Sequence, residues 1–233
     1  GGAPLASELR QKFLDIFQLH PPRVVQIWGM TEGGWFTTFK YPEDDASGSV
    51  GRPVPGCEIT VDCNNAIQLS DGRIAGELYM RGPSIMTEYI GAPEATSDTL
   101  INGWLRTGDI GYVHDGKVYV VDRAKDLIKV NCWQVSPTEV ESALLESPGV
   151  EDVAVIGVGH GVDEHPMAFV VRTSDKCTAQ DLRQHLYQTL ARYKVVYCEF
   201  RFVDSIPKSA SGKILRKELK RSVGAVGQTR RQE

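Results

Sequence analysis

Four short segments carry side chains suited to handling a nucleotide and its phosphates. They are Trp28-Gly29-Met30-Thr31-Glu32, Thr107-Gly108-Asp109, Asp122-Arg123, and the loop from Lys208 to Lys213. In the first segment, an aromatic ring can stack on a purine, a hydroxyl can bond a phosphate oxygen, and a carboxylate can hold Mg²⁺ with the phosphates. The alternative interpretation is a tight turn beside a half-buried Trp28, and this segment alone does not decide between the two.

The second and third segments carry a carboxylate and a guanidinium. Asp109 follows a turn glycine, and a carboxylate so placed can accept hydrogen bonds from both hydroxyls of a ribose. A plain turn carboxylate is the alternative. Arg123 lies in a run of five charges within residues 122–129. We interpret this run either as a solvated linker or as a hinge from which Arg123 reaches nucleotide oxygens.

The fourth segment is a loop that ends in the long cationic side chain of Lys213. When a carboxylate attacks an α-phosphate, negative charge accumulates on the transferring group, and a lysine that reaches in can stabilise that charge. Ser211-Gly212-Lys213 superficially resembles the end of a G-x-x-x-x-G-K-[ST] phosphate loop. We reject that match because the first glycine is absent and Ile214 follows the lysine.

Two other polar clusters are interpreted as solvated surface. The first lies in one loop, and its spacing fits no standard zinc motif. The second is a basic face on the last predicted helix of a chain whose net charge is -4, which argues against a nucleic-acid partner. The first cluster is His160, Asp163, Glu164 and His165, and the second is Lys213, Arg216, Lys217, Lys220 and Arg221.

The bulk composition sets further limits. The chain is 41% hydrophobic and 24% charged, as is usual for a soluble globular protein. No apolar run approaches the roughly 18 residues of a membrane-spanning helix. The five cysteines are irregularly spaced without a C-x-x-C pair, which predicts neither a disulfide framework nor a zinc site and favours a cytoplasmic protein. Because the chain starts abruptly and without Met, we interpret it as a fragment.

The elements that position these segments change in character near Arg123. Before it, helical spacing predicts a helix over Ser7–Leu19, and an apolar run predicts a buried strand over Val24–Trp28. Short strands and turns then predict a mostly β subdomain. Its clearest signals are the dipeptides Asp71-Gly72 and Asp115-Gly116, which are typical of hairpin turns.

After Arg123 the pattern predicts a small α+β domain. Ser136-Pro137-Thr138-Glu139 is typical of a helix start, and we expect that helix to run through Glu146. Thr178-Ala179-Gln180-Asp181 predicts a second helix start, with Leu182, Leu186 and Leu190 on one face. Strands are predicted at Val150–Val158, Met167–Arg172 and Phe200–Val203.

In their order and spacing, these motifs resemble the adenylate-forming superfamily, which includes acyl- and aryl-CoA ligases, adenylation domains of nonribosomal peptide synthetases, and beetle luciferases. The resemblance runs from Gly1 to about Arg221 and is nearest to the acyl-CoA synthetase and 4-coumarate–CoA ligase-like branch. It implies an α/β and α+β fold. Residues 1–124 would be the end of the large adenylation domain with its β subdomain, and residues 125–233 a small mobile α+β lid domain.

The resemblance also implies a role for each matching position in the first domain. Gly2-Ala3-Pro4 is similar to the loop that borders the adenine. Trp28-Gly29-Met30-Thr31-Glu32 matches the aromatic-Gly-Met-Thr-Glu motif, in which Thr31 would touch phosphate and Glu32 the magnesium. Asp109 matches the aspartate that binds the ribose, and Arg123 matches its partner.

Four positions near or within the lid match the family in the same way. Lys125 falls at the hinge about which the small domain rotates between the two half-reactions. Lys129 and Gln134 match nucleotide-site positions implicated in the 4-coumarate ligase branch. Lys213 matches the lysine that serves adenylation.

The implied activity is ATP-dependent activation of a carboxylic acid to an acyl-adenylate, followed by transfer to coenzyme A. ATP, Mg²⁺ and coenzyme A would be required, and the partners would be a small carboxylic acid, ATP and CoA, with no nucleic acid. Two alternatives stay open: an adenylation domain that loads a carrier protein, and a non-catalytic truncated relative.

Three departures from the family pattern qualify this reading. The upstream Ser/Thr/Gly-rich phosphate loop is absent, so the chain as given is expected not to complete a turnover. Asn131-Cys132 stands where a residue followed by glycine is typical, which is expected to weaken the CoA step. Ile27 stands where aryl-CoA ligases often have glycine, which favours a small or compact acid.

Overall fold

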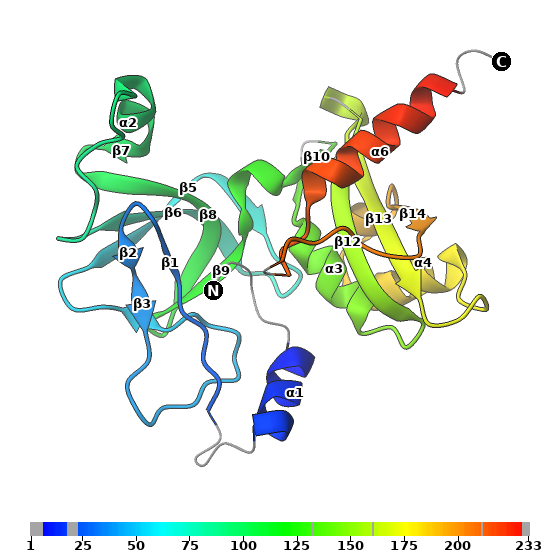
Figure 1. Cartoon of the computed structure of the whole chain (residues 1–233), viewed down its shortest axis with the longest axis horizontal. Helices are drawn as coiled ribbons and strands as arrows, with labels where there is room; N and C mark the ends of the chain where they lie inside the picture. Colours follow the sequence, from blue (N-terminus) through cyan, green and yellow to red (C-terminus); the bar gives the residue numbers. More distant parts are fainter. Residues whose placement is uncertain (1–6, 18–22, 132, 160, 211, 230–233) are drawn as a thin grey trace. The chain divides into compact units, whose positions relative to one another are not determined.

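The computed structural model describes residues 7–17, 23–131, 133–159, 161–210 and 212–229 (Figure 1). The chain divides into two compact units, Gly1–Ala124 and Lys125–Glu233. Each unit combines helices with β-sheet. In the described residues, no helix combines the length and the apolar character that crossing a membrane requires.

A five-stranded antiparallel sheet forms the centre of the first unit. The strand order is β5-β6-β8-β7. The first residues of β8 pair with β7, and the later residues of β8 pair with β9. The strands are β5 (Glu58–Gln68), β6 (Ile74–Arg81), β7 (Leu100–Ile101), β8 (Trp104–His114) and β9 (Lys117–Arg123). The predicted turns at Asp71-Gly72 and Asp115-Gly116 connect β5 to β6 and β8 to β9, which confirms both hairpins. At the second turn Asp115 and Gly116 both have positive φ, 50° and 70°, as a two-residue I′ turn requires.

One face of this sheet forms the core of the unit. Leu78 and Met80 alternate along β6 and are fully buried, together with Leu105 and Val118 from the neighbouring strands. Trp28 belongs to the same cluster, so the segment that carries it is anchored on the sheet.

The remaining elements of the first unit are short. They are the helices α1 (Ser7–Phe17) and α2 (Pro93–Thr99), the hairpin of β1 (Gly29–Met30) with β2 (Gly34–Trp35), and the pair β3 (Thr37–Thr38) with β4 (Arg52–Pro53). The predicted first helix is confirmed over Ser7–Phe17, and its last two residues lie outside the described ranges.

The predicted strand Val24–Trp28 is wrong. A strand needs a neighbouring segment that continues its ladder, and residues 24–27 have none among the described residues. Trp28 itself is held by bonds outside any ladder: its carbonyl accepts from the amides of Phe36 (2.9 Å) and Thr37 (3.3 Å), and its own amide donates to Thr37 Oγ1 (3.2 Å).

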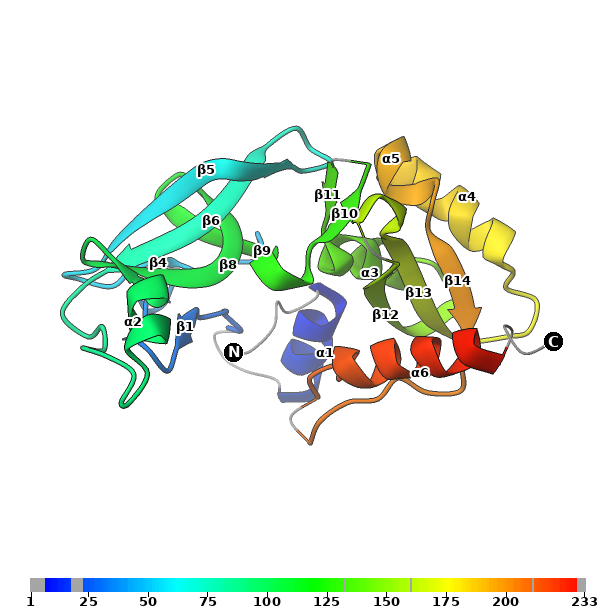
Figure 2. The same cartoon turned by 90° about the horizontal axis from the view of Figure 1, so that it is seen from above.

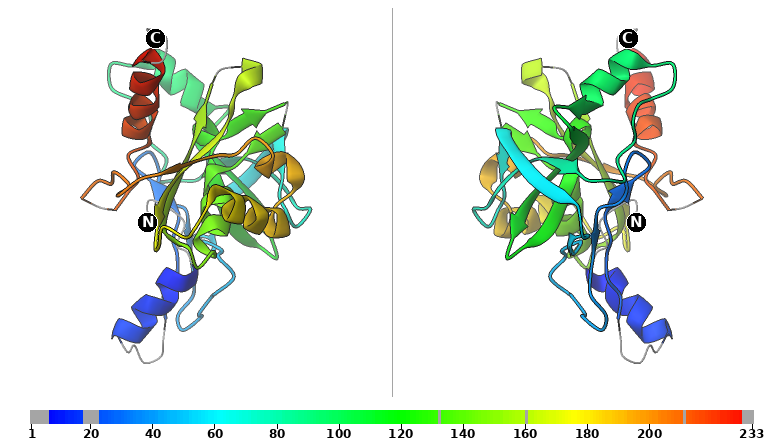
Figure 3. Two further views of the ribbon diagram at one scale, coloured as in Figure 1. Left: turned by 90° about the vertical axis from the view of Figure 1, so that its right-hand side faces the viewer. Right: turned by 90° about the vertical axis from the view of Figure 1, so that its left-hand side faces the viewer.

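The second unit is a three-stranded sheet with helices on both faces. Strand β12 (Val150–Val158) is antiparallel to β13 (His165–Arg172), which is parallel to β14 (Glu199–Phe202). The helices are α3 (Pro137–Leu145), α4 (Ala179–Thr189), α5 (Arg192–Val195) and α6 (Arg216–Thr229), and the hairpin of β10 (Ile128–Val130) with β11 (Trp133–Val135) precedes them. Figures 2 and 3 show α4 and α6 on opposite sides of the sheet.

Alternation along β12 explains this layering. Val153 and Val155 join the cluster that includes residues of α3 and α4, whereas Ala154 and Ile156 join the cluster that includes Leu219 of α6. Successive side chains of a strand point to opposite faces, so the continuous apolar run 153–156 is buried on both sides.

Two helix starts have the predicted caps. Ser136 Oγ accepts from the amide of Glu139 (3.1 Å), and Pro137 occupies the first turn of α3. At α4, Thr178 and Asp181 form a complete reciprocal capping box. Both predicted helices are therefore confirmed, although α3 ends at Leu145, one residue earlier than predicted.

Candidate functional site

The β8–β9 hairpin places Asp109 directly opposite Arg123. Near the turn, the numbers of any two paired residues add up to 231, as they do for His114 and Lys117. If this pairing continued without a break, Asp109 would lie opposite Asp122. An irregularity between Ile110 and Gly111 shifts the register by one residue, so the opposite residue is Arg123 instead. This bulge replaces two facing like charges with an ion pair.

Asp109 is bonded by two side chains from distant segments. Trp28 Nε1 donates to its Oδ2 (2.7 Å), and Arg123 Nη1 lies 3.0 Å from its Oδ1. Thr107 supports the arrangement, because its Oγ1 accepts from the Asp109 amide (3.1 Å) and donates to the carbonyl of Leu78 (2.7 Å). Arg123 Nη1 also donates to the Thr107 carbonyl (3.1 Å).

Burial dominates the electrostatics of this carboxylate. Asp109 is only 8% exposed, and burial raises its pKa above the usual value. The hydrogen bond from Trp28 and the positive charge of Arg123 act in the opposite direction and favour the ionised form. Each carboxylate oxygen has two lone pairs, so both can accept a further bond. The arrangement therefore fits a pair of vicinal hydroxyls such as those of a ribose.

Trp28 contributes its N–H to this site more than its ring. It is 6% exposed, and the ring of Phe36 packs edge-on against it with centroids 5.0 Å apart. Little of the indole face is left for the purine stacking that the sequence suggested.

Thr31 and Glu32 lie in the turn that joins β1 to β2. Thr31 is exposed, and Glu32 is half-buried. The hydroxyl of Tyr89 donates to Glu32 Oε1 (2.8 Å), which raises the pKa of Tyr89, and the amide of Met86 donates to the Glu32 carbonyl (2.8 Å). The segment 84–89 therefore holds this turn in place.

The backbone of this hairpin requires glycine at position 29. A Cβ on Gly29 would lie 2.2 Å from the carbonyl oxygen of Gly34, which is closer than real contacts allow.

In the described part of the chain, no group of three or more His, Cys, Asp or Glu side chains is arranged to hold a metal ion.

In the second unit, Lys129 and Gln134 are direct partners across the β10–β11 hairpin. Facing residues in an antiparallel pair project to the same side of the ribbon, so the two side chains are neighbours. Lys129 is exposed, and its amide donates to Glu164 Oε2 (3.1 Å). Lys125 is exposed in the short 3₁₀ helix η1 (Ala124–Asp126), at the first position of this unit.

Lys213 is exposed in the connection between β14 and α6. Its backbone is paired with Ser209: the Ser209 amide donates to the Lys213 carbonyl (2.8 Å), and the Lys213 amide donates to Ser209 Oγ (3.2 Å). Gly212 has φ of 81°, a conformation in which glycine is favoured.

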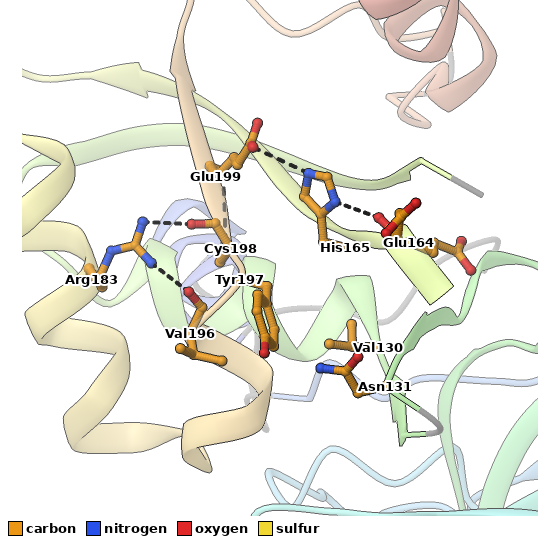
Figure 4. A pocket seen from close by; sticks show the side chains of 10 residues that line it. Val130, Asn131, Glu164, His165, Arg183, Val196, Tyr197, Cys198 and Glu199 are labelled. Atoms are coloured by element: carbon orange, nitrogen blue, oxygen red, sulfur yellow. Dashed lines mark hydrogen bonds and ion pairs between the residues drawn. The ribbon is translucent and has the colours of Figure 1, made fainter. Parts of the chain in front are cut away.

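A pocket in the second unit lies beside the β10–β11 turn (Figure 4). Arg183 forms part of its wall by donating to the carbonyls of Val196 (3.2 Å) and Cys198 (2.9 Å), and His165 Nε2 lies 3.3 Å from Glu199 Oε1. Burial raises the pKa of the Cys198 thiol to about 12, so this thiol stays protonated at neutral pH and is no nucleophile.

The structure thus brings together some of the predicted site residues and not others. Trp28, Asp109 and Arg123 meet in the first unit, and Lys129 and Gln134 meet in the second. Gly2, Ala3 and Pro4, like Cys132 and His160, lie outside the described residues. Sequence reasoning missed the supporting roles of Thr107 and Tyr89. Thr107 lies in a segment that had been singled out, but Tyr89 lies in no motif and gives no signal.

Comparison with known proteins defines the class. The sequence model described as "AMP-binding enzyme" matches residues 1–90, and the one described as "AMP-binding enzyme C-terminal domain" matches residues 139–213. The chain belongs to the AMP-binding, adenylate-forming enzymes, which confirms the predicted family.

Among curated relatives, an acyl-CoA ligase, clz12, of Cochliobolus lunatus is 51% identical over 96% of this chain and 65% of its own length. The 4-coumarate–CoA ligase 2 of Oryza sativa subsp. japonica is 40% identical over 97% of this chain and 41% of its own length. The chain therefore spans less than two thirds of either relative.

A solved structure shows the same fold. O-succinylbenzoate coenzyme A synthetase (MenE) from Bacillus subtilis, in complex with AMP, is 32% identical over 94% of this chain and 44% of its own, with a TM-score of 0.73. This likeness confirms the predicted mixed α/β and α+β fold.

Proposed function

We propose that the protein carrying this chain activates a small carboxylic acid with ATP and transfers the acyl group to coenzyme A. The observation that carries the proposal is the buried Asp109 carboxylate, bonded by Trp28 and Arg123 and able to accept from ribose hydroxyls. Membership of the AMP-binding family and the ligase names of the relatives support it.

Each unit has a part in this proposal. Residues 1–124 are the C-terminal part of the large AMP-binding domain, and residues 125–233 are its C-terminal lid. The two family matches, which fall on opposite sides of the division after Ala124, support this assignment. Lys125, as the first residue of the second unit, is the proposed hinge.

In the first half-reaction an oxygen of the substrate carboxylate attacks the α-phosphorus of ATP, and the bond to the departing pyrophosphate breaks. Asp109 holds the ribose, Thr31 bonds a phosphate oxygen, and Glu32 would hold Mg²⁺. Mg²⁺, when bound, offsets the negative charge of the phosphates. Lys213 bridges the carboxylate and the α-phosphate as negative charge accumulates between them. Its exposure at the end of a loop supports this role.

In the second half-reaction the thiol sulfur of coenzyme A attacks the acyl carbonyl carbon, and AMP leaves with the electrons of the acyl–phosphate bond. The neighbouring side chains of Lys129 and Gln134 line the nucleotide site in this step. We place the enzyme in the cytoplasm, where free cysteines such as the exposed Cys63 stay reduced.

The test is acid-dependent exchange of pyrophosphate into ATP by the whole protein, with a panel of aromatic and short to medium aliphatic acids. AMP release is followed in parallel with and without coenzyme A. Exchange with at least one acid, and AMP release that requires coenzyme A, would support the ligase. Exchange without any response to coenzyme A would favour the carrier-loading alternative. No exchange with any acid would favour the non-catalytic relative and overturn the proposal.

A further inference from the structure

We infer that Arg216 and Glu141 are positioning residues that fix Lys213 for the adenylation step. The inference rests on the proposed function, because it concerns the loop that carries the proposed adenylation lysine. Arg216 is the first residue of α6 and follows Lys213 by three positions.

Arg216 ties the start of α6 to two other elements. Its Nη2 donates to Glu141 Oε1 of α3 (2.6 Å), and its Nε donates to the carbonyl of Val155 in β12 (3.3 Å). Glu141 Oε1 also accepts from the amide of Val155 (2.8 Å). One carboxylate oxygen and one guanidinium therefore lock α3, β12 and α6 to one another.

The burial of this ion pair makes its geometry specific. Glu141 is 8% exposed, and the Arg216 side chain is also largely covered. A buried carboxylate that loses its cation is strongly unfavourable, so the native position of Arg216 is well defined. A lysine at this position would be a weaker anchor, because an ammonium does not reach two acceptors with the fixed geometry of a guanidinium.

The other end of the loop is fixed to the same strand. Lys208 Nζ donates to Asp152 Oδ2 (2.6 Å), and the amide of Leu215 donates to the carbonyl of Pro207 (2.9 Å). Lys208 and Ile214 form an isolated antiparallel bridge, and Ile214 packs on the cluster beneath α6. Lys213 is thus an exposed cation between two anchored ends, and its reach depends on where those ends are held.

This geometry predicts a selective defect when the pair is changed. Glu141→Gln and Arg216→Lys keep the size and polarity of each side chain but weaken the anchor. A misplacement of a reacting group by about 1 Å can cost about 100-fold in rate, so we expect adenylation to fall 10- to 100-fold, or thereabouts. Thioester formation from supplied acyl-adenylate does not need Lys213 and should stay within about twofold of the unaltered protein.

A matched control lies in α3, two residues before Glu141. Glu139 of α3 pairs with Lys194, whose Nζ lies 2.6 Å from Glu139 Oε2 and which is 1% exposed. This second buried ion pair ties α3 to α5, not to the loop of Lys213. Glu139→Gln should lower thermal stability as Glu141→Gln does, yet leave the ratio of the two half-reaction rates unchanged.

The experiment measures both half-reactions in the whole protein for each variant, in the presence and absence of Lys213→Ala. If Arg216 acts through Lys213, Arg216→Lys should slow adenylation when Lys213 is present. The same substitution should have no further effect in the Lys213→Ala variant. Equal losses in both half-reactions, no loss in either, or full additivity with Lys213→Ala would overturn the inference. Absence of adenylation by the unaltered protein would instead overturn the proposed function.

Discussion

The indole nitrogen of Trp28 donates a 2.7 Å hydrogen bond to the carboxylate of Asp109, which lies 81 residues further along the chain. The bond fixes the orientation of the carboxylate and favours its ionised form in a buried place. The segments that carry Trp28, Asp109 and Arg123 are separate in the sequence, and this hydrogen bond together with the Asp109–Arg123 ion pair holds them in one site.

Removing this donor should weaken the site. Trp28→Phe keeps an aromatic ring but loses the N–H, and a hydrogen bond to a charged group is worth about 1.5–3 kcal/mol. We expect the Kd for ATP, measured by calorimetry, to rise about 10-fold or more. Trp35→Phe is the matched control, because Trp35 is an exposed tryptophan in β2. Equal ATP affinity in the two variants would contradict this role.

The same substitution should change how stability depends on pH. Burial raises the pKa of Asp109 in the folded state. Its contribution to the free energy of unfolding is therefore fully present below its unfolded pKa and is lost as the pH rises through the folded pKa. Trp28→Phe removes an influence that lowers this pKa, so the loss should extend to higher pH. Thermal unfolding from acidic to neutral pH measures this, and a profile that matches that of Trp35→Phe would count against it.

Much of the local structure follows from the sequence because it depends on residues close in the chain. The turn at Asp115-Gly116 and the caps at Ser136 and Thr178 involve side chains and amides no more than three positions apart. The order of the motifs was also enough to indicate the family. For the turn and the caps the deciding physical interactions are local.

Longer-range features could not be predicted in this way. The run Val24–Trp28 has strand-like composition but finds no ladder among the described residues. The turn alone would set Asp109 opposite Asp122, and only the bulge brings in Arg123. The contacts of Tyr89 with Glu32 and of Arg216 with Glu141 join residues 57 and 75 positions apart, and no spacing rule indicates them.

The partner of Glu32 gives a test of the proposed metal position. Tyr89→Phe removes a hydrogen bond to the proposed metal-binding carboxylate, and loss of such an outer partner typically weakens metal affinity by 10-fold, or roughly so. We expect the Mg²⁺ concentration for half-maximal activity to rise about that much, and to rise more in Glu32→Gln. Tyr187→Phe, at an exposed position in α4, serves as the control. An unchanged Mg²⁺ requirement in Glu32→Gln would exclude Glu32 as a ligand.

The hairpin that carries Thr31 and Glu32 should not tolerate a side chain at position 29. In Gly29→Ala the new Cβ would meet the Gly34 carbonyl at 2.2 Å, so the hairpin must open and displace the turn. Strain of this kind costs about 1–3 kcal/mol, and ATP binding should weaken accordingly. Gly34→Ala has no such contact and meets only the cost of positive φ, about 1 kcal/mol. Calorimetry of ATP binding compares the two, and equal affinities would argue against the steric account.

The cap of α4 gives a prediction of stability alone. Thr178→Ala removes the hydroxyl that accepts from the Asp181 amide, and loss of a cap typically costs about 1 kcal/mol. Thr178→Ser retains the oxygen and should stay close to the unaltered protein. Denaturant unfolding of the second unit measures both, and equal destabilisation by the two substitutions would show that the methyl group matters instead of the cap.

The central claim is that Lys213 serves the formation of an acyl-adenylate, and acid-dependent exchange of pyrophosphate into ATP tests it most directly. The comparison is Lys213→Ala against Lys217→Ala, a second exposed lysine at the start of α6. Loss of one preorganised charge at a transition state costs on the order of 100- to 1,000-fold in rate, so Lys213→Ala should slow exchange by about that much and Lys217→Ala by less than about twofold. Exchange that proceeds equally fast in both variants would contradict the account.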